Sequence, residues 1–196
     1  MSAAPFLLVL DLEATCDDRD PRQRSRGDVG AVPKHEMETI EIGAVLVARA
    51  SLEIVEAFDT FVAPVRHPRL TPFCTRLTSI RQADVDAAPR FPEAMKRLRA
   101  FLAGRAVTFC SWGDYDKHQL AQDGMHHRVG VDLGPHVNLR VAFTKRRGLA
   151  KRPDVGEALA RVGLSFEGTP HRGIDDARNI ARLLPWILVD DTFPSV

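Results

Sequence analysis

Two carboxylates stand at the end of an apolar run near the start of the chain. Residues 6–10 are continuously apolar and are typical of a buried strand, and Asp11 and Glu13 follow them. Residues two apart in a strand point to the same side, so both carboxylates would project together. Like charges this close repel unless a cation lies between them, and Mg²⁺ and Mn²⁺ prefer such oxygen ligands. The pair indicates a metal site; the alternative is a polar strand end that meets solvent.

A second acidic group follows another apolar segment, where the sequence from Cys110 to Asp116 predicts the end of a strand, a turn and the start of a helix. Asp116 lies one helical turn before Leu120, so its side chain can share the inward face of that helix. Asp114 precedes charged residues and fits an exposed N-cap better. Taken alone, this pattern is more typical of a helix cap than of a metal ligand.

A third group lies near the C-terminus, where His171 stands in the turn before a predicted helix. Asp176 is four residues before Ile180 and so lies on the apolar stripe, whereas Asp175 shares the solvent stripe with Arg178. A carboxylate on a buried stripe needs a partner, because an unpaired buried charge is costly. A histidine in a loop is, by itself, more often only a solvated residue.

Together these groups are more informative than any one of them. Four inward-directed acids and one loop histidine, on three separate elements, indicate a site that cleaves phosphodiesters with two metal ions. In such sites the metals stabilise the attacking and leaving oxygens, and a histidine can take the proton of the nucleophilic water. The residues that we expect to carry this chemistry are Asp11, Glu13, Asp116, Asp176 and His171.

The elements that must position these residues alternate along the chain. Apolar periodicity predicts strands at 6–10, 40–47, 54–62, 106–110 and 137–141 and helices at 91–102, 114–123 and 174–189, the last bent at Pro185. Asp154 and Glu157 resemble a capping box that begins one more helix. This order predicts an α/β fold, with a mixed central sheet flanked by helices on both faces.

Composition limits the class of protein. With 196 residues and a net charge of +1, we expect one domain over 1–196 whose polyanion binding, if any, depends on local basic clusters. Residues 17–36 are polar and rich in Gly and Pro, which predicts a long exposed loop. Three cysteines suit a reducing compartment, and we expect them to be core residues. The first residues carry no basic segment before a short apolar run, so we expect a cytoplasmic protein without a signal peptide or membrane span.

The motifs in their order along the chain resemble the DEDDh 3′→5′ exonucleases, in particular the branch with the histone-mRNA 3′ exonuclease. The resemblance spans about residues 6–184 and rests on the segments Asp11-Leu-Glu13-Ala-Thr-Cys, Glu41-Ile-Gly-Ala-Val, Cys74-Thr-Arg-Leu-Thr-Ser-Ile, Trp112-Gly-Asp-Tyr-Asp116 and His171-Arg-Gly-Ile-Asp-Asp176. It implies a ribonuclease H-like fold. A sister class has a tyrosine where the histidine stands, but the only tyrosine here is Tyr115, far from that motif.

The resemblance also implies the activity and the site. It implies release of nucleoside 5′-monophosphates from single-stranded 3′ ends of RNA or DNA, with RNA favoured, and two divalent ions, Mg²⁺ or Mn²⁺. The four acids would hold the metals and His171 would be the general base. Residues implied to bind the terminal nucleotide are Ala14 and Thr15, through backbone contacts, and Leu77, Thr78, Tyr115 and His171, of which Tyr115 suits base stacking.

Other functions are also compatible with this sequence. An oligoribonuclease-like enzyme or a proofreading subunit would use the same chemistry, and a catalytically silent nucleic-acid-binding module would keep only the fold. Ser79 stands where the family often has Gly, and the 17–36 loop is longer than usual. Two basic stretches could guide the strand or could be solvated surface: Arg66, Arg69, Arg76 and Arg81, and Arg140, Lys145, Arg146, Arg147, Lys151 and Arg152.

Overall fold

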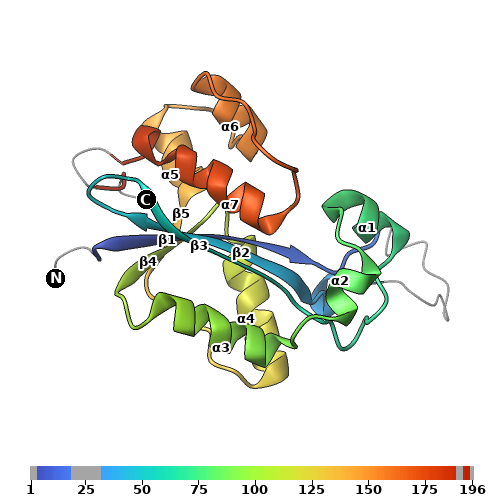
Figure 1. The fold of residues 1–196 in the computed structure, drawn as a ribbon. Helices are drawn as coiled ribbons and strands as arrows, with labels where there is room; N and C mark the ends of the chain where they lie inside the picture. Colours follow the sequence, from blue (N-terminus) through green and yellow to red (C-terminus); the bar gives the residue numbers. More distant parts are fainter. Residues whose placement is uncertain (1–3, 19–31, 189–191, 195–196) are drawn as a thin grey trace.

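A twisted five-stranded sheet forms the centre of the protein (Figure 1), in a computed structural model that describes residues 4–18, 32–188 and 192–194. The strand order is β3-β2-β1-β4-β5. β2 pairs antiparallel with β1 and β3, whereas β4 runs parallel to β1 and β5, so the sheet is mixed. The strands are β1 (Phe6–Ala14), β2 (Thr39–Ala48), β3 (Ile54–Phe61), β4 (Val107–Ser111) and β5 (His136–Asn138).

Helices cover both faces of this sheet. In Figure 1, α3 and α4 lie below the sheet, α5, α6 and α7 lie above it, and α1 and α2 lie at one end. Every helix in the described part of the chain is too short or too polar to cross a bilayer. The helices are α1 (Pro72–Thr78), α2 (Gln82–Asp86), α3 (Phe91–Leu102), α4 (Tyr115–His127), α5 (Leu139–Arg146), α6 (Val155–Arg161) and α7 (Gly173–Arg182), with 3₁₀ turns η2 (Lys34–Glu36) and η3 (Leu184–Trp186).

The core is divided by the central strand. Alternate residues of β1 point to opposite faces, so Leu7 and Val9 pack under α5 and α7, whereas Leu8 and Leu10 pack against α3. β1 is buried on both faces, as its continuous apolar run predicts. The predicted mixed sheet with helices on both faces is confirmed.

Two sequence-based expectations in the last third of the chain are wrong. The strand expected at 137–141 ends at Asn138, because the Asn138 side chain accepts a hydrogen bond from the Val141 backbone N–H and caps α5. The helix expected at 174–189 ends as α7 at Arg182, because Pro185 has no N–H with which to continue the helical ladder. A 3₁₀ turn, η3, follows it.

Three helices of the described structure, α1, α2 and α5, were not expected from the sequence. Thr71 is the N-cap of α1: its side-chain oxygen accepts a hydrogen bond from the Cys74 N–H at 3.0 Å, and Pro72 occupies the first helical position. Thr followed by Pro is a helix-start signal that the sequence carried. Of the loop expected at 17–36, residues 19–31 lie outside the described residues, and 34–36 form η2.

The first turn of α7 touches the sheet backbone at two glycines. A Cβ on Gly43 of β2 would lie 2.0 Å from the backbone of Gly173, and one on Gly173 would lie 3.0 Å from the Asp11 carbonyl oxygen. Only residues without a side chain allow this approach. The contact fixes the start of α7, which carries Asp175 and Asp176, beside the end of β1.

We expect Gly43→Ala to lower the free energy of unfolding by about 3 kcal/mol or more, because a methyl group cannot enter this backbone contact without moving α7. Urea denaturation followed by circular dichroism measures this loss. Gly156→Ala is the control, since its added Cβ would meet only the Asp154 carboxylate at 3.5 Å. Equal midpoints for the two variants would contradict the close approach.

Candidate active site

Carboxylates from two elements meet at the C-terminal end of β1. Asp11 and Glu13 lie within β1, which is longer than the strand expected at 6–10, and Asp176 lies in the first turn of α7. One oxygen of each carboxylate lies within 4.8 Å of the others. Residues separated by more than 160 positions in the sequence therefore form one acidic cluster, of a size that suits bound cations.

The fourth acid reaches the same place from α4. Asp116 is buried, and its Oδ1 accepts a hydrogen bond of 3.0 Å from the backbone N–H of Leu12, the residue between Asp11 and Glu13. This bond joins the first turn of α4 to β1. Asp114 occupies the N-cap position and is exposed as expected, but its side chain makes no capping hydrogen bond within the described structure.

The two adjacent acids of α7 have different surroundings. Asp176 accepts a hydrogen bond of 2.8 Å from the His171 backbone N–H at its Oδ2 and faces the acidic cluster. Asp175 instead accepts from the Thr169 N–H and contacts Arg178, on the solvent side of the helix. The structure thus has the orientation that helical spacing predicts, with Asp176 toward the acidic cluster and Asp175 toward solvent.

His171 lies at the mouth of the site. Its backbone has a φ of 61°, in the left-handed region, and its side chain is exposed. It lines the same pocket as the four acids. An imidazole at this place can reach solvent and the acidic cluster, which is the position that a proton acceptor requires.

A pocket of about 330 Å³ surrounds the acids, a volume that suits a small ligand. Ala14, Leu77 and Tyr115 line it, together with His171, as expected from the sequence. Its full lining is Asp11, Leu12, Glu13, Ala14, Cys16, Met37, Leu77, Trp112, Tyr115, Asp116, Val155, His171 and Asp176.

Two expected nucleotide-binding residues do not line this pocket. The Thr15 side chain is buried and accepts a hydrogen bond from the Glu38 N–H at 2.9 Å. Thr78 is fully buried, and its hydroxyl donates to the Cys74 carbonyl oxygen within α1. Because both hydroxyl groups are bonded to the backbone, neither is available to a nucleotide in the pocket.

The sequence reasoning missed other parts of the wall. Trp112 directly follows β4 and lines the pocket, with its Nε1–H donating to the Pro153 carbonyl oxygen at 3.1 Å. Cys16, expected in the core, is only half-buried and also lines the pocket. Their positions in the sequence could have indicated this, because each lies just beyond the C-terminal end of one of two neighbouring parallel strands, β1 and β4.

Burial and mutual repulsion strongly perturb the acids. Burial, then the neighbouring carboxylates, raise the pKa of Glu13 to about 9 and the pKa of Asp11 well above its usual range. Burial likewise raises the pKa of Asp116 to about 7 and that of Asp176 to about 6. Carboxylates that resist ionisation together are stabilised by a divalent cation between them, so the donor set fits hard divalent metals.

We expect the metal-free protein to lose stability as the pH rises from about 5 to about 9. The folded-state pKa of Glu13 lies above its unfolded value, so the cost of ionising it is absent at low pH and complete above about 9. Melting temperatures of the parent and Glu13→Gln in chelator measure this, because their difference isolates one carboxyl group. The variant should become relatively more stable with increasing pH, and a pH-independent difference would contradict the assignment.

A buried ion pair fixes the start of α7 next to these acids. Glu41 of β2 is fully buried opposite Glu13 in the ladder, and it accepts hydrogen bonds from the Arg172 guanidinium and, at 3.0 Å, from the Gly173 N–H. The Arg172 guanidinium also lies 5.1 Å from the centre of the Phe61 ring. These contacts hold the turn between His171 and Asp176 against the sheet.

Comparison with known proteins identifies relatives of this chain. It is 31% identical over 190 residues to the mouse protein "ERI1 exoribonuclease 3" and 29% identical over 209 residues to the "3'-5' exonuclease eri1" of Schizosaccharomyces pombe. Each alignment covers 91% of this chain, but 52% of the mouse protein and 66% of the yeast protein. The chain thus spans about half the length of the mouse relative.

A solved structure agrees with the fold. The nuclease domain of 3'hExo, described as a DEDDh family member bound to rAMP, superposes with a TM-score of 0.81 and 26% identity, covering 93% of this chain and 91% of that domain. This confirms the ribonuclease H-like fold and the resemblance to DEDDh enzymes expected from the sequence. The profile of the exonuclease family RNase_T matches residues 8–184. The chain therefore belongs to this family of exonucleases.

Proposed function

We propose that this chain is a 3′→5′ exonuclease that hydrolyses the terminal phosphodiester of single-stranded nucleic acid and releases nucleoside 5′-monophosphates. The observation that carries the proposal is the cluster of Asp11, Glu13 and Asp176, with oxygens within 4.8 Å, in a pocket that also contains Asp116 and His171. A silent binding module would gain nothing from four carboxylates whose pKa values are raised by burial and, for Asp11, Glu13 and Asp116, also by other carboxylates of this set.

The acids would hold two divalent ions, Mg²⁺ or Mn²⁺, with Asp11, Glu13, Asp116 and Asp176 as ligands. Such ions stabilise the charge on the attacking and leaving oxygens of the scissile phosphate. The protein supplies the geometry: the Leu12–Asp116 hydrogen bond fixes one acid, and the packing of Gly173 on Gly43 fixes another. Preorganised ligands lower the cost of assembling the transition state.

His171 would take the proton from the attacking water. Its exposed imidazole lies on the solvent side of the pocket, where it can release that proton to bulk water. Tyr115 and Leu77 line the pocket and would pack against the terminal base, for which the half-exposed Tyr115 ring offers a stacking surface. The substrate we favour is RNA, supported by relatives that are named exoribonucleases and by the rAMP bound to 3'hExo.

Only part of the basic sequence is available to a nucleic acid. Arg140 donates to the carbonyl oxygens of Pro153 and Arg152, and Arg146 to that of Ile187, so these two guanidinium groups support the fold. The exposed Lys151 and Arg152 lie just before α6, whose first residue, Val155, lines the pocket. We propose that this second pair contacts the phosphates of the incoming strand.

The decisive experiment compares 5′-labelled RNA and DNA of one sequence, each as single strand, duplex and stem-loop, in Mg²⁺, Mn²⁺ or chelator. We expect stepwise shortening from the 3′ end of single strands and nucleoside 5′-monophosphate as the product, with none in chelator. Chromatography of the product distinguishes it from a 3′-monophosphate.

The other candidate functions give different results in the same assay. Hydrolysis confined to very short RNAs would indicate an oligoribonuclease-like enzyme, and preference for mispaired duplex DNA would indicate proofreading. Binding of the labelled strand in both metals without any shortening would contradict the proposal and indicate a silent binding module.

A further inference from the structure

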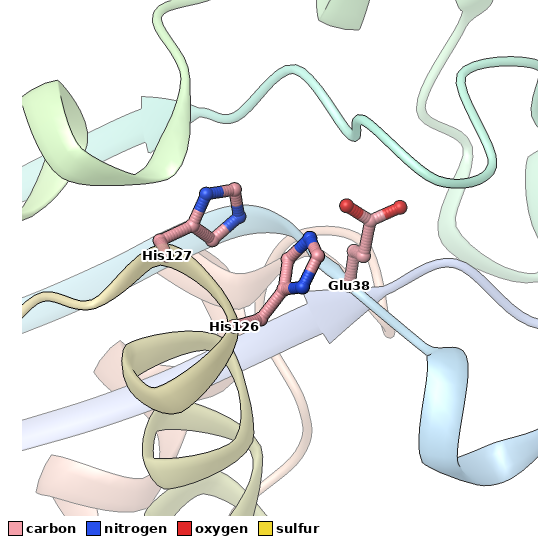
Figure 2. Close-up of side chains that lie close together, drawn as sticks. All are labelled: Glu38, His126 and His127. Atoms are coloured by element: carbon pink, nitrogen blue, oxygen red, sulfur yellow. The ribbon is translucent and has the colours of Figure 1, made fainter.

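A second group of metal-ligating side chains lies outside the acidic pocket. Glu38 stands just before β2, and His126 and His127 are the last two residues of α4. Figure 2 shows the carboxylate beside the two imidazole rings. One ligand atom from each lies within 4.8 Å of the others. None of the three belongs to the lining of the pocket described above.

The Glu38 carboxylate is held rigidly. Glu38 is 3% exposed, and its carboxylate oxygens accept hydrogen bonds of 2.8 to 2.9 Å from the backbone N–H groups of Val65, Arg66 and His67. Oε1 accepts one of these bonds and Oε2 accepts two. A carboxylate has about four lone-pair positions, so Oε1 keeps one for another donor or cation. Backbone hydrogen bonds of this kind are typical supports of a metal-ligating carboxylate.

The two imidazole groups are also constrained. The His127 ring stacks on Phe91 with 5.4 Å between ring centres, and the His126 ring contacts the His127 ring edge-on, with 4.6 Å between their centres. The carbonyl groups at the C-terminus of a helix favour a positive charge nearby, and α4 ends here. In the structure that charge is supplied by Arg66, whose Nη2 lies 2.5 Å from Nδ1 of His126.

We propose that Glu38, His126 and His127 form a second metal site, selective for a transition-metal ion such as Zn²⁺. In the absence of metal, the Arg66 guanidinium takes the position of the cation. Two imidazole nitrogens and one carboxylate oxygen are ligands that Zn²⁺ accepts, with water in the fourth position. The exposed Arg66 side chain can turn into solvent when the ion binds. This set differs from the all-oxygen cluster at the end of β1, which suits harder ions.

The site has a structural consequence for the pocket. Glu38 follows Met37, which lines the pocket and whose carbonyl oxygen accepts hydrogen bonds from Gln119 and Gln122 of α4. A metal ion would add a bond between the end of α4 and this same segment. Binding should therefore stabilise the folded state and the pocket wall, whatever substrate the pocket accepts.

Isothermal titration of untagged protein with Zn²⁺ tests the proposal, in an Asp11→Asn, Asp176→Asn background that weakens the acidic site. We expect one Zn²⁺ per chain and a rise in melting temperature that chelator reverses. When Co²⁺ replaces Zn²⁺, we expect visible d–d absorption bands typical of nitrogen and oxygen ligands. His126→Ala should weaken binding by roughly 10- to 100-fold or more, the range known for losing even a supporting group. His118→Ala is the control, because His118 is exposed on the same helix and outside the cluster.

Arg66→Ala gives an independent test. Removing the competing guanidinium should tighten Zn²⁺ binding, whereas a site elsewhere on the protein would be indifferent to it. Absence of saturable binding in the double-Asn background would overturn the proposal, since Zn²⁺ would then bind the acids only. Equal affinities for His126→Ala and His118→Ala would overturn it too.

Discussion

Replacing Asp11 or Asp116 with Asn is expected to remove nearly all hydrolysis while the chain stays folded. Metal ions in sites of the proposed kind stabilise the transition state by several kcal/mol, and each 1.36 kcal/mol corresponds to a factor of ten in rate, so we expect a loss of at least about 10³-fold. Losing one carboxylate would disturb both of the proposed ions, because the acids line one pocket. Single-turnover hydrolysis of a labelled oligonucleotide at saturating metal measures the loss.

The same experiment has a matched pair on α7. Asp176→Asn should behave like Asp11→Asn, whereas Asp175→Asn should keep most of the activity, because Asp175 contacts Thr169 and Arg178 on the solvent side. The two substitutions make the same chemical change one residue apart. Without metal, Asp176→Asn should melt at a higher temperature than the parent, since the substitution removes a partly buried charge and its repulsion of Asp11 and Glu13. The reverse ranking of activities would contradict the ligand assignment.

The acidic site could be predicted because its signals are local. The apolar run before Asp11 and Glu13 places both acids at a strand end, and helical spacing places Asp116 and Asp176 on buried faces. What sequence spacing cannot give is the distance between elements. The approach of Gly173 to Gly43 requires two backbone segments 130 residues apart, and no local pattern encodes it.

The parts that could not be predicted depend on competition between local and tertiary preferences. The segment after Val137 is apolar enough for a strand, but the cap at Asn138 decides for a helix. Thr78 was expected to border the terminal nucleotide, but its side chain is buried and its hydroxyl donates to the Cys74 carbonyl oxygen within α1. In both cases one hydrogen bond to the backbone determines the outcome.

His171→Ala should lower turnover by roughly 10²- to 10⁴-fold, the usual contribution of one general acid or base. The backbone N–H of residue 171 donates to Asp176, and this contact survives the substitution because it does not involve the imidazole. Metal affinity and nucleotide affinity should therefore change little. Rapid-quench kinetics at saturating substrate separates this loss of turnover from a loss of binding.

A further measurement distinguishes a role of His171 as proton acceptor from a purely structural role. Exogenous imidazole should restore part of the activity of His171→Ala, since the side chain is exposed at the mouth of the pocket and leaves space open to solvent. His118→Ala serves as the control, because it removes an exposed histidine of α4 that lies outside the pocket. Unchanged turnover in His171→Ala would show that another group accepts the proton.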